Sequence, residues 1–167
     1  MKNVFFVILL SMYSSLIYSQ RIQNKIWGCE YGANRADIIS VIEKQGFKYI
    51  DQGDKIKMEY PVFGGMKFDY GYFYFYLNRM YMCQFSVDFR EKGIATSFYN
   101  CLKDNLSRKY GFVEDFYSDE SKITLYDDNI NGIKLDQINL SLGGVYRYGV
   151  NLVYCNWIIL KEVTNEM

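Results

Sequence analysis

The chain has 167 residues, half of them hydrophobic, and its 19 basic residues are balanced by 19 acidic ones. This length corresponds to one domain, and because no block of like charge stands out, the composition argues against a nucleic-acid-binding protein. The chain has no histidine, so neither a histidine-dependent active site nor a histidine-based metal site is available.

Residues 1–19 have the pattern of a cleavable signal peptide. Lys2 is followed by a mainly apolar stretch, Val4–Tyr18, that contains three serines and precedes a small residue. A membrane-spanning helix needs about 20 predominantly apolar residues, so an uncleaved anchor is the less favoured interpretation. The first cysteine, Cys29, lies too far along the chain for lipid attachment at the new N-terminus. We therefore expect residues 20–167 to form one exported, soluble domain, periplasmic or secreted, with no membrane span after cleavage.

Residues 34–45 are predicted to form the first helix. Apolar residues recur at helical spacing and would lie together on the buried side of this helix: Ile38, Ile39 and Ile42, with Val41 left open. Asn34 is a suitable N-cap residue, and Gly46 follows the last turn as the glycine that commonly ends a helix.

Residues 94–110 are predicted to form the second helix. Its apolar positions follow helical spacing and would face the sheet: Phe98, Cys101, Leu102 and Leu106. Basic residues occupy the last turn, where they complement the helix dipole, and Gly111 ends the helix.

Strand-like runs follow each predicted helix. They cover residues 55–60, 66–77 and 80–89 in the first half, and residues 122–126, 133–142 and 145–160 in the second. The two helix ends also match, since residues 41–47 and 106–112 share an apolar residue, Lys, Gly and Phe in the same order. We predict an α+β fold with two helices packed on one face of an antiparallel sheet. A tandem duplication of a helix-plus-strands unit, residues 28–89 and 94–160, and a chance match are both open.

The run of residues 70–77 alternates two kinds of side chain. Strand geometry would direct Phe73, Phe75 and Leu77 to one face of the sheet. The tyrosines would point to the other face: Tyr70, Tyr72, Tyr74 and Tyr76. The apolar face would meet the helices, and the opposite face would present a row of tyrosines. Cross-strand pairing on an exposed sheet and the binding of a partner both explain such a row.

The following strand is predicted to extend the same two faces. It would be joined to the first through a hairpin turn at Asn78 and Arg79, which places Tyr81 on the apolar face. Tyr146 and Tyr148 from the second half of the chain are expected to lengthen the row of tyrosines on the opposite face.

The cysteines fit an exported chain, in which disulfides persist. They are Cys29, Cys83, Cys101 and Cys155, and none lies in a C-x-x-C pair. One or two disulfides and buried thiols are both open interpretations, because spacing alone does not give the Cα separation that a bridge needs. No metal site and no cofactor are expected.

Acidic residues gather at two predicted turns. Residues 127–132 match the first half of a calcium loop, but the twelfth position is Ile138 and strands flank the segment. An Asn-Gly hairpin turn explains the same residues. The two candidate carboxylate pairs of the glycosidase type are Asp51 with Asp54 and Asp127 with Asp128. Both pairs lie beside turn glycines, where solvated carboxylates are expected.

Two short motifs flank the predicted helices. They are Trp27-Gly-Cys-Glu-Tyr31-Gly-Ala-Asn34 before the first and Leu106-Ser-Arg-Lys-Tyr-Gly111 at the end of the second. Together with the export signal, these motifs resemble small exported Bacteroidetes proteins, whose architecture is similar to that of the beta-lactamase inhibitor protein and of small outer-membrane assembly lipoproteins. The resemblance implies helices on one face of an antiparallel sheet and a partner protein on the other. No inhibitory loop and no lipobox is recognisable, so neither specific function carries over.

These features together favour an exported binding domain over an enzyme. Its partner would be a protein or peptide of the cell envelope or the extracellular space, bound through the tyrosines of the sheet. A glycan-binding module that uses the same aromatic side chains is the second hypothesis. A carboxylate-dependent hydrolase is the third, and it has the least support, because the chain carries no recognisable catalytic motif.

Overall fold

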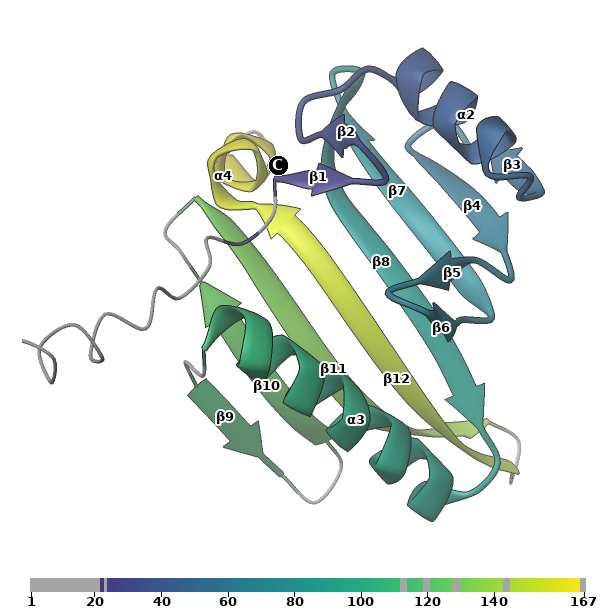
Figure 1. Cartoon of the computed structure of the whole chain (residues 1–167), viewed down its shortest axis with the longest axis vertical. Helices are drawn as coiled ribbons and strands as arrows, with labels where there is room; N and C mark the ends of the chain where they lie inside the picture. The colour runs from purple at the N-terminus through teal and green to yellow at the C-terminus, as the bar shows by residue number, and fades with distance from the viewer. Residues whose placement is uncertain are drawn as a thin grey trace, which may run out of the picture.

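One large antiparallel sheet, with helices and two small hairpin sheets packed on it, forms the described part of the chain (Figure 1). The computed structural model describes residues 22, 24–111, 114–118, 121–127, 130–142 and 145–165. The predicted signal peptide, residues 1–19, lies outside these ranges. The helices are α2 (Arg35–Lys44), α3 (Lys92–Tyr110) and α4 (Trp157–Asn165). None of these described helices is long and apolar enough to cross a membrane.

The large sheet has eight strands. In spatial order they are β3 (Tyr49–Asp51), β4 (Lys55–Glu59), β7 (Tyr70–Tyr76), β8 (Arg79–Phe89), β12 (Val145–Asn156), β11 (Asn131–Leu142), β10 (Ser121–Asp127) and β9 (Glu114–Tyr117). Each half of the sheet is a meander, and the two meanders meet at the antiparallel pair β8–β12. A helix precedes each meander in the chain, but this arrangement does not by itself establish a duplication.

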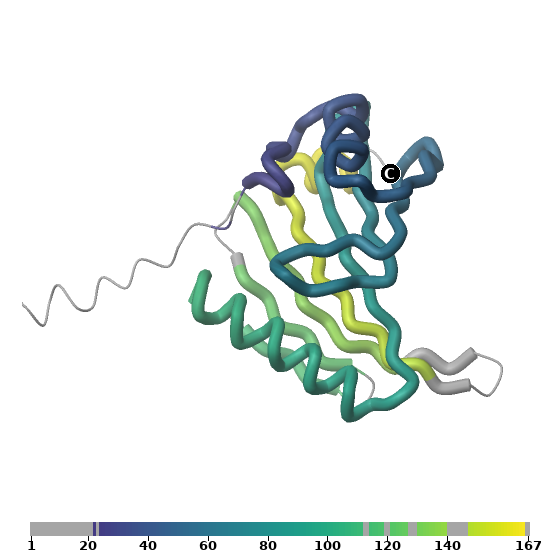
Figure 2. The backbone as a smooth tube through the Cα atoms, turned by 45° about the vertical axis from the view of Figure 1, so that its right-hand side comes forward, coloured from purple at the N-terminus to yellow at the C-terminus, as the bar shows by residue number. Residues whose placement is uncertain are grey.

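The hydrophobic core lies between one face of the sheet and a layer made of α2, α3 and the two small hairpins. These hairpins are β1 (Lys25–Ile26) with β2 (Cys29–Glu30), and β5 (Val62–Phe63) with β6 (Met66–Lys67). Figure 2 shows the β5–β6 hairpin between α2 and α3 in this layer. Phe85 of β8 is fully buried beneath it, and the Phe63 ring stacks on the Phe85 ring with centroids 4.5 Å apart.

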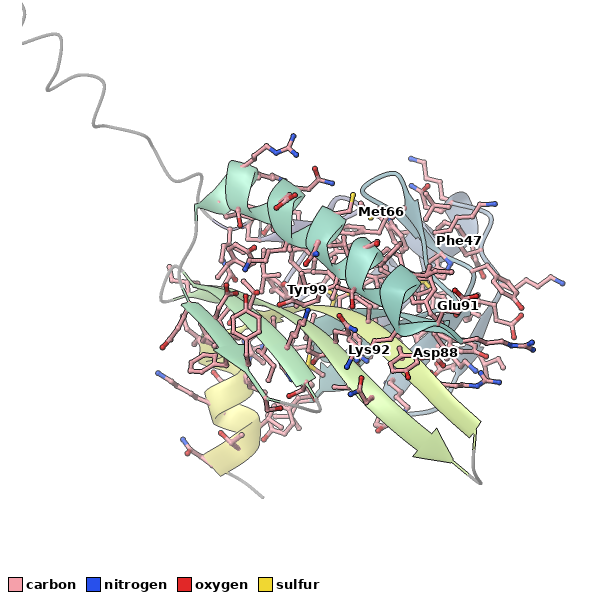
Figure 3. The ribbon with its side chains drawn as sticks, turned by 90° about the horizontal axis from the view of Figure 1, so that it is seen from below. Phe47, Met66, Asp88, Glu91, Lys92 and Tyr99 are labelled. Carbon is pink, nitrogen blue, oxygen red and sulfur yellow. The ribbon has the colours of Figure 1, made fainter. Side chains whose placement is uncertain are left out.

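The predicted α+β fold with two helices on one face is wrong. The described chain is mainly β, with three helices, and α4 lies on the opposite side of the sheet from α3 (Figure 3). Residues 157–165 form α4, whereas the sequence pattern had predicted one strand over residues 145–160. Asn156 caps the new helix, because its Oδ1 accepts a hydrogen bond from the Ile159 backbone N–H at 3.0 Å. An apolar run that continues a strand fits either more strand or a new helix. Here the Asn156 cap favours the helix.

The end signals predicted for the first helix are confirmed in α2. The Asn34 Oδ1 atom accepts a hydrogen bond from the Asp37 backbone N–H at 3.0 Å, so Asn34 is the N-cap. Gly46 has a φ of +77°, a left-handed conformation that glycine adopts at helix ends without steric cost. Ile38 and Ile42 are buried as predicted.

The prediction for α3 is correct at its C-terminal end, too short at its N-terminal end, and partly wrong in its buried face. The helix begins at Lys92 and ends before Gly111, whose backbone N–H donates to the Ser107 carbonyl at 3.0 Å. Its buried side chains are Ala95, Tyr99, Leu102, Leu106 and Tyr110. Cys101 is exposed rather than buried, because the apolar stripe passes through Tyr99 and Leu102 instead.

All four cysteines are thiols in the structure, so the disulfide interpretation is not supported. Cys29, Cys83 and Cys155 are buried and Cys101 is exposed. Cys83 lies on the core face of β8, as its position in the strand predicted, and burial raises the pKa of its thiol well above the ordinary value. Buried neutral thiols of this kind pack as small hydrophobic groups.

Gly132, in β11, lies directly under the indole ring of Trp157, and a Cβ at position 132 would overlap the Trp157 ring atoms. We expect Gly132→Ala to displace α4 and to lower the free energy of unfolding by about 1–3 kcal/mol, measured by urea denaturation. Gly93→Ala in α3 is the control, because no atom lies within 4 Å of its added Cβ. A Gly132→Ala protein as stable as the control would contradict this packing.

Candidate functional site

The candidate site lies on the face of the sheet that points away from α2 and α3. The strand register shows which side chains share this face. In the β4–β12 part of the sheet they are Lys55, Lys57, Glu59, Tyr70, Tyr72, Tyr74, Tyr76, Met82, Gln84, Ser86, Asn151, Val153 and Cys155. α4 contacts β8, β11 and β12 at one end of this face, and Arg79 pairs with Glu162 of α4 at 3.1 Å. α4 therefore covers one end and leaves the β7 region at the surface.

The alternation predicted for β7 is confirmed from Tyr70 to Tyr76, but it is wrong for Leu77, which lies in the turn and is 74% exposed. Gly71, Phe73 and Phe75 are buried on the core face, whereas the tyrosines between them are exposed or half-buried on the opposite face. Tyr70 is 37% exposed. The Tyr72 and Tyr74 rings contact each other, with centroids 6.1 Å apart. The strand thus presents aromatic rings on both faces of the sheet, and only the phenylalanine face lies in the core.

The position of Tyr81 is the main difference from the predicted strand register. The turn is Leu77-Asn78, with φ values of +45° and +63°, rather than the predicted Asn78-Arg79. A β-bulge opposite the Tyr74/Phe75 step then breaks the alternation of β8. Tyr81 therefore lies beside Tyr74, with ring centroids 6.4 Å apart, and not on the apolar face. We name Tyr70, Tyr72, Tyr74, Tyr76 and Tyr81 the tyrosine face.

Two lysines of β4 lie over the rings of the tyrosine face. The Lys57 ammonium lies 4.1 Å from the Tyr70 ring centroid. The Lys55 ammonium lies 5.7 Å from the Tyr72 ring and 5.8 Å from the Tyr74 ring. Such cation–π contacts contribute about 0.5–1 kcal/mol each at exposed sites and hold the side chains in place. The sequence alone did not identify these lysines, because the pairing of β4 with β7 had not been predicted.

A row of polar side chains borders the tyrosine face and crosses the centre of the sheet. We name Gln84, Ser86, Asn151, Asp136 and Lys134 the polar row. Tyr74 donates a hydrogen bond to Gln84 Oε1 at 3.3 Å, and Ser86 Oγ donates to Asn151 Oδ1 at 2.7 Å. Asn151 Nδ2 in turn donates to Asp136 Oδ1 at 2.7 Å, and Asp136 pairs with Lys134 at 2.8 Å. The network links β7, β8, β12 and β11 into one stiff surface.

The hydroxyl groups of Tyr74 and Tyr81 remain protonated near neutral pH. Burial, followed by the neighbouring Tyr72, raises the pKa of Tyr74 above its ordinary value. Burial and the charge of Asp54 raise the pKa of Tyr81 in the same direction. These groups therefore act as neutral hydrogen-bond donors and acceptors, and a contact made through them does not depend on pH in the neutral range.

The second half of the chain does not contribute Tyr148 to this surface as predicted. Tyr148 pairs with Phe89 across β12 and β8 and packs against the hydrophobic core, on the side of α3. The side chain of Tyr146 lies outside the part of the chain that the structure describes at side-chain level. The described tyrosine face is thus confined to β7 and β8.

The candidate carboxylate pairs do not show a built acid–base site. Asp51 accepts hydrogen bonds from Arg35 at 2.6 Å and from the Gly53 backbone N–H at 3.0 Å, and Asp54 is exposed beside it. Of the second pair, the Asp127 side chain and Asp128 lie outside the described residues. The predicted β10–β11 hairpin is present, with Asp127 opposite Gly132. Among the described residues, no three Cys, Asp or Glu side chains gather to hold a metal ion.

One cluster of charged and hydroxyl groups lies between α3 and the edge of the sheet. Lys103 of α3 pairs with Asp115 of β9, which also accepts hydrogen bonds from Thr124 at 2.5 Å and from Tyr117 at 2.9 Å. Burial alone raises the pKa of Asp115, but the hydrogen bonds from Lys103, Thr124 and Tyr117 outweigh it and lower that pKa below its usual value. A group poised for acid–base catalysis would instead titrate near neutral pH. The cluster is therefore better suited to anchoring β9 to α3.

Comparison with known proteins found no matching family model, curated protein or solved structure. The resemblance to small exported proteins with an architecture like that of the beta-lactamase inhibitor protein stays a prediction that rests on the two motifs quoted above. The evidence on function therefore comes from the arrangement of the described side chains.

Proposed function

We propose that this chain is an exported, non-catalytic binding domain that recognises a protein or peptide through the tyrosine face. The observation that carries the proposal is the continuous aromatic surface on β7 and β8. The Tyr74 ring contacts those of Tyr72 and Tyr81, and two lysines lie over rings of the face. All of these rings lie on the side of the sheet that α2 and α3 do not cover. Tyrosine provides a large contact area with little loss of side-chain entropy, and its hydroxyl group adds specificity.

The charges around the tyrosine face indicate what kind of segment it fits. Lys55 and Lys57 line one side of the face and have their ammonium groups over the rings, while Glu59 follows on the same strand and the charge of Asp54 acts on Tyr81. On the other side, the carboxylate of Asp136 is already paired with Lys134. Complementary charge at the edge of an interface guides association and suppresses wrong partners. We therefore propose a partner segment that combines apolar or aromatic side chains with carboxylates.

Exchange of two central tyrosines tests this function. Replacing both Tyr72 and Tyr74 by serine removes the paired rings but no buried core side chain, since both are only half-buried. We expect the double variant to lose at least tenfold in affinity for the partner that the full chain captures from a cell-envelope lysate. Partner identity is established by mass spectrometry, and affinity by titration with the purified partner.

A variant on the opposite layer provides the matched control. Ile94 of α3 is 51% exposed, so Ile94→Ser also removes exposed apolar area, but from the layer on the other side of the sheet. We expect Ile94→Ser to bind like the unaltered chain. Undiminished binding by the Tyr72→Ser/Tyr74→Ser variant, with an unchanged circular dichroism spectrum, would overturn the proposal.

A glycan is the second candidate ligand, because the polar row lies next to the aromatic rings. Planar amide groups such as those of Gln84 and Asn151 hydrogen-bond well to sugar hydroxyls, while aromatic rings stack on sugar faces. This alternative predicts a saturable change in tyrosine fluorescence with envelope polysaccharides, lost in Asn151→Ala. A glycan array without hits would rule out the glycan-binding alternative and favour the protein or peptide partner.

A further inference from the structure

The helix-covered side of the sheet contains a pocket that the proposed function does not use. It has a volume of about 420 Å³ and lies between α3, the β1–β2 turn and the β5–β6 hairpin. Leu152 and Tyr154 of β12 form its floor, and Leu102 and Leu106 of α3 form one wall. Pockets of about 300–1,000 Å³ hold small organic ligands. This pocket is therefore large enough for one such molecule and lies on the opposite side of the sheet from the tyrosine face.

The second wall of the pocket is aromatic and firmly held. It consists of Trp27 and Phe63, whose rings contact each other at 6.2 Å and both contact Phe85 of the sheet, at 5.7 Å and 4.5 Å. Because this wall is braced by a fully buried side chain, the apolar cavity is already formed without a ligand. A preformed apolar pocket binds a chain of methylene groups without a large ordering cost.

The charged groups that line the pocket are both cationic. They are Lys25 of β1 and Lys109 of α3, and among the described residues no acidic side chain lines the pocket. Lys25 pairs with Glu30 at 2.9 Å, but both side chains are more than half exposed, so this ion pair contributes little and exchanges readily. The Lys109 ammonium lies 4.9 Å from the Tyr110 ring centroid. The lining thus joins an apolar interior to a positive charge.

From this combination we infer that the pocket binds an amphipathic carboxylate, with its apolar chain along Leu102, Leu106 and Trp27 and its carboxylate at Lys25 and Lys109. The apolar lining accounts for the hydrocarbon part of the ligand, and the two lysines account for its negative charge. The binding of a medium-chain fatty acid, or of another carboxylate of that size, is the simplest form of this chemistry. The inference is independent of the partner proposed for the tyrosine face.

The fluorescence of Trp27 reports on this pocket. The other tryptophan, Trp157, lies in α4 on the opposite side of the sheet, so a Trp157→Phe chain has its one tryptophan in the pocket wall. We expect sodium decanoate, below its micelle concentration, to change this fluorescence saturably, and decanol to bind about tenfold more weakly. Calorimetry of the unaltered chain with decanoate provides the same measurement if the Trp157→Phe chain does not fold.

Two variants separate the apolar from the charged part of the site. Lys25→Gln combined with Lys109→Gln is expected to reduce decanoate affinity to that of decanol without changing decanol binding. Asn105→Phe places a ring at the exposed rim of the pocket and is expected to weaken both ligands. No saturable decanoate signal in either assay, or equal affinity for decanoate and decanol in the unaltered chain, overturns the inference.

Discussion

Replacing Phe85 by alanine is expected to lower the free energy of unfolding by about 3–5 kcal/mol, the usual cost of truncating a buried phenylalanine. Phe85 is fully buried in β8 and is surrounded by other rings. The Phe63 ring stacks on it at 4.5 Å, and the Phe68 and Trp27 rings lie 5.4 Å and 5.7 Å away. The substitution therefore removes the side chain that joins both small hairpins to the sheet, and it leaves a cavity.

Urea denaturation followed by far-UV circular dichroism measures this loss. Ile94→Ala, at a position 51% exposed on α3, is the control and is expected to change stability by less than about 1 kcal/mol. Because Trp27 and Phe63 also form the pocket wall, the Phe85→Ala protein should bind decanoate more weakly wherever it remains folded. A Phe85→Ala protein within about 1 kcal/mol of the unaltered chain would show that the hairpins are held by other contacts.

The second large effect is expected from Asp115→Ala, which leaves the Lys103 ammonium without its carboxylate. The Lys103 and Asp115 side chains are only 21% and 16% exposed. Breaking a buried ion pair costs about 3–5 kcal/mol, and partial exposure reduces this to an expected loss of about 2–4 kcal/mol at pH 7. Lys25→Ala breaks the exposed pair with Glu30 and serves as the control, with an expected loss below about 1 kcal/mol.

The contribution of Asp115 should depend on pH with a definite sign. Its pKa is lower in the folded chain than in the unfolded chain, where it is about 3.9. The stabilisation is therefore fully present above that unfolded-state pKa and is lost as the pH falls through the folded-state pKa. The difference in stability between the unaltered chain and Asp115→Ala should be constant from pH 7 to pH 5 and shrink below about pH 4. A difference that grows on acidification contradicts the proposed role of the carboxylate.

The stabilising contribution of Lys103 depends on pH in the opposite direction to that of Asp115. Burial lowers its pKa, but the hydrogen bonds to Asp115 and Tyr117 outweigh this effect and raise the pKa above the ordinary value. Its stabilising contribution is thus complete below the unfolded-state pKa of about 10.4 and is lost as the pH rises through the folded-state pKa. The anchor between β9 and α3 should therefore be intact throughout the neutral range.

Local signals in the sequence predicted the parts of the fold that depend on neighbouring residues. The cap at Asn34, the glycine at position 46 and the alternation of residues 70–76 all act within a few residues, and each is found in the structure. The same reasoning failed for Cys101, whose exposure depends on which side of α3 meets the sheet.

The features that sequence patterns did not predict depend on strand pairing, on a run that fits two structures, and on packing between segments. The bulge at Tyr81 shifts a side chain from one face of β8 to the other, and strand alternation alone cannot indicate it. α4 was missed because its apolar residues continue those of β12, although Asn156 is a recognisable cap in retrospect. The sequence predicts Gly132 in an Asn-Gly hairpin turn. In the structure it lies in β11, where the absence of a side chain makes room for the Trp157 ring.

These differences change the shape of the candidate site. α4 covers one end of the open face, and among the residues described at side-chain level the row of tyrosines is confined to β7 and β8. Tyr81 and the two lysines add to it, while Tyr148 belongs to the core. The described surface has two lysines with Glu59 on the β4 edge, and the ammonium groups that lie over the rings give the proposed partner a more specific chemistry.

Site-specific photo-crosslinking tests the central claim most directly. A benzoylphenylalanine residue is placed at position 72 of the tyrosine face or at position 94 of α3, and each chain is irradiated with the captured partner. We predict a covalent adduct from position 72 and none from position 94. An adduct from position 94, with none from position 72, would contradict the assignment of the tyrosine face as the binding surface.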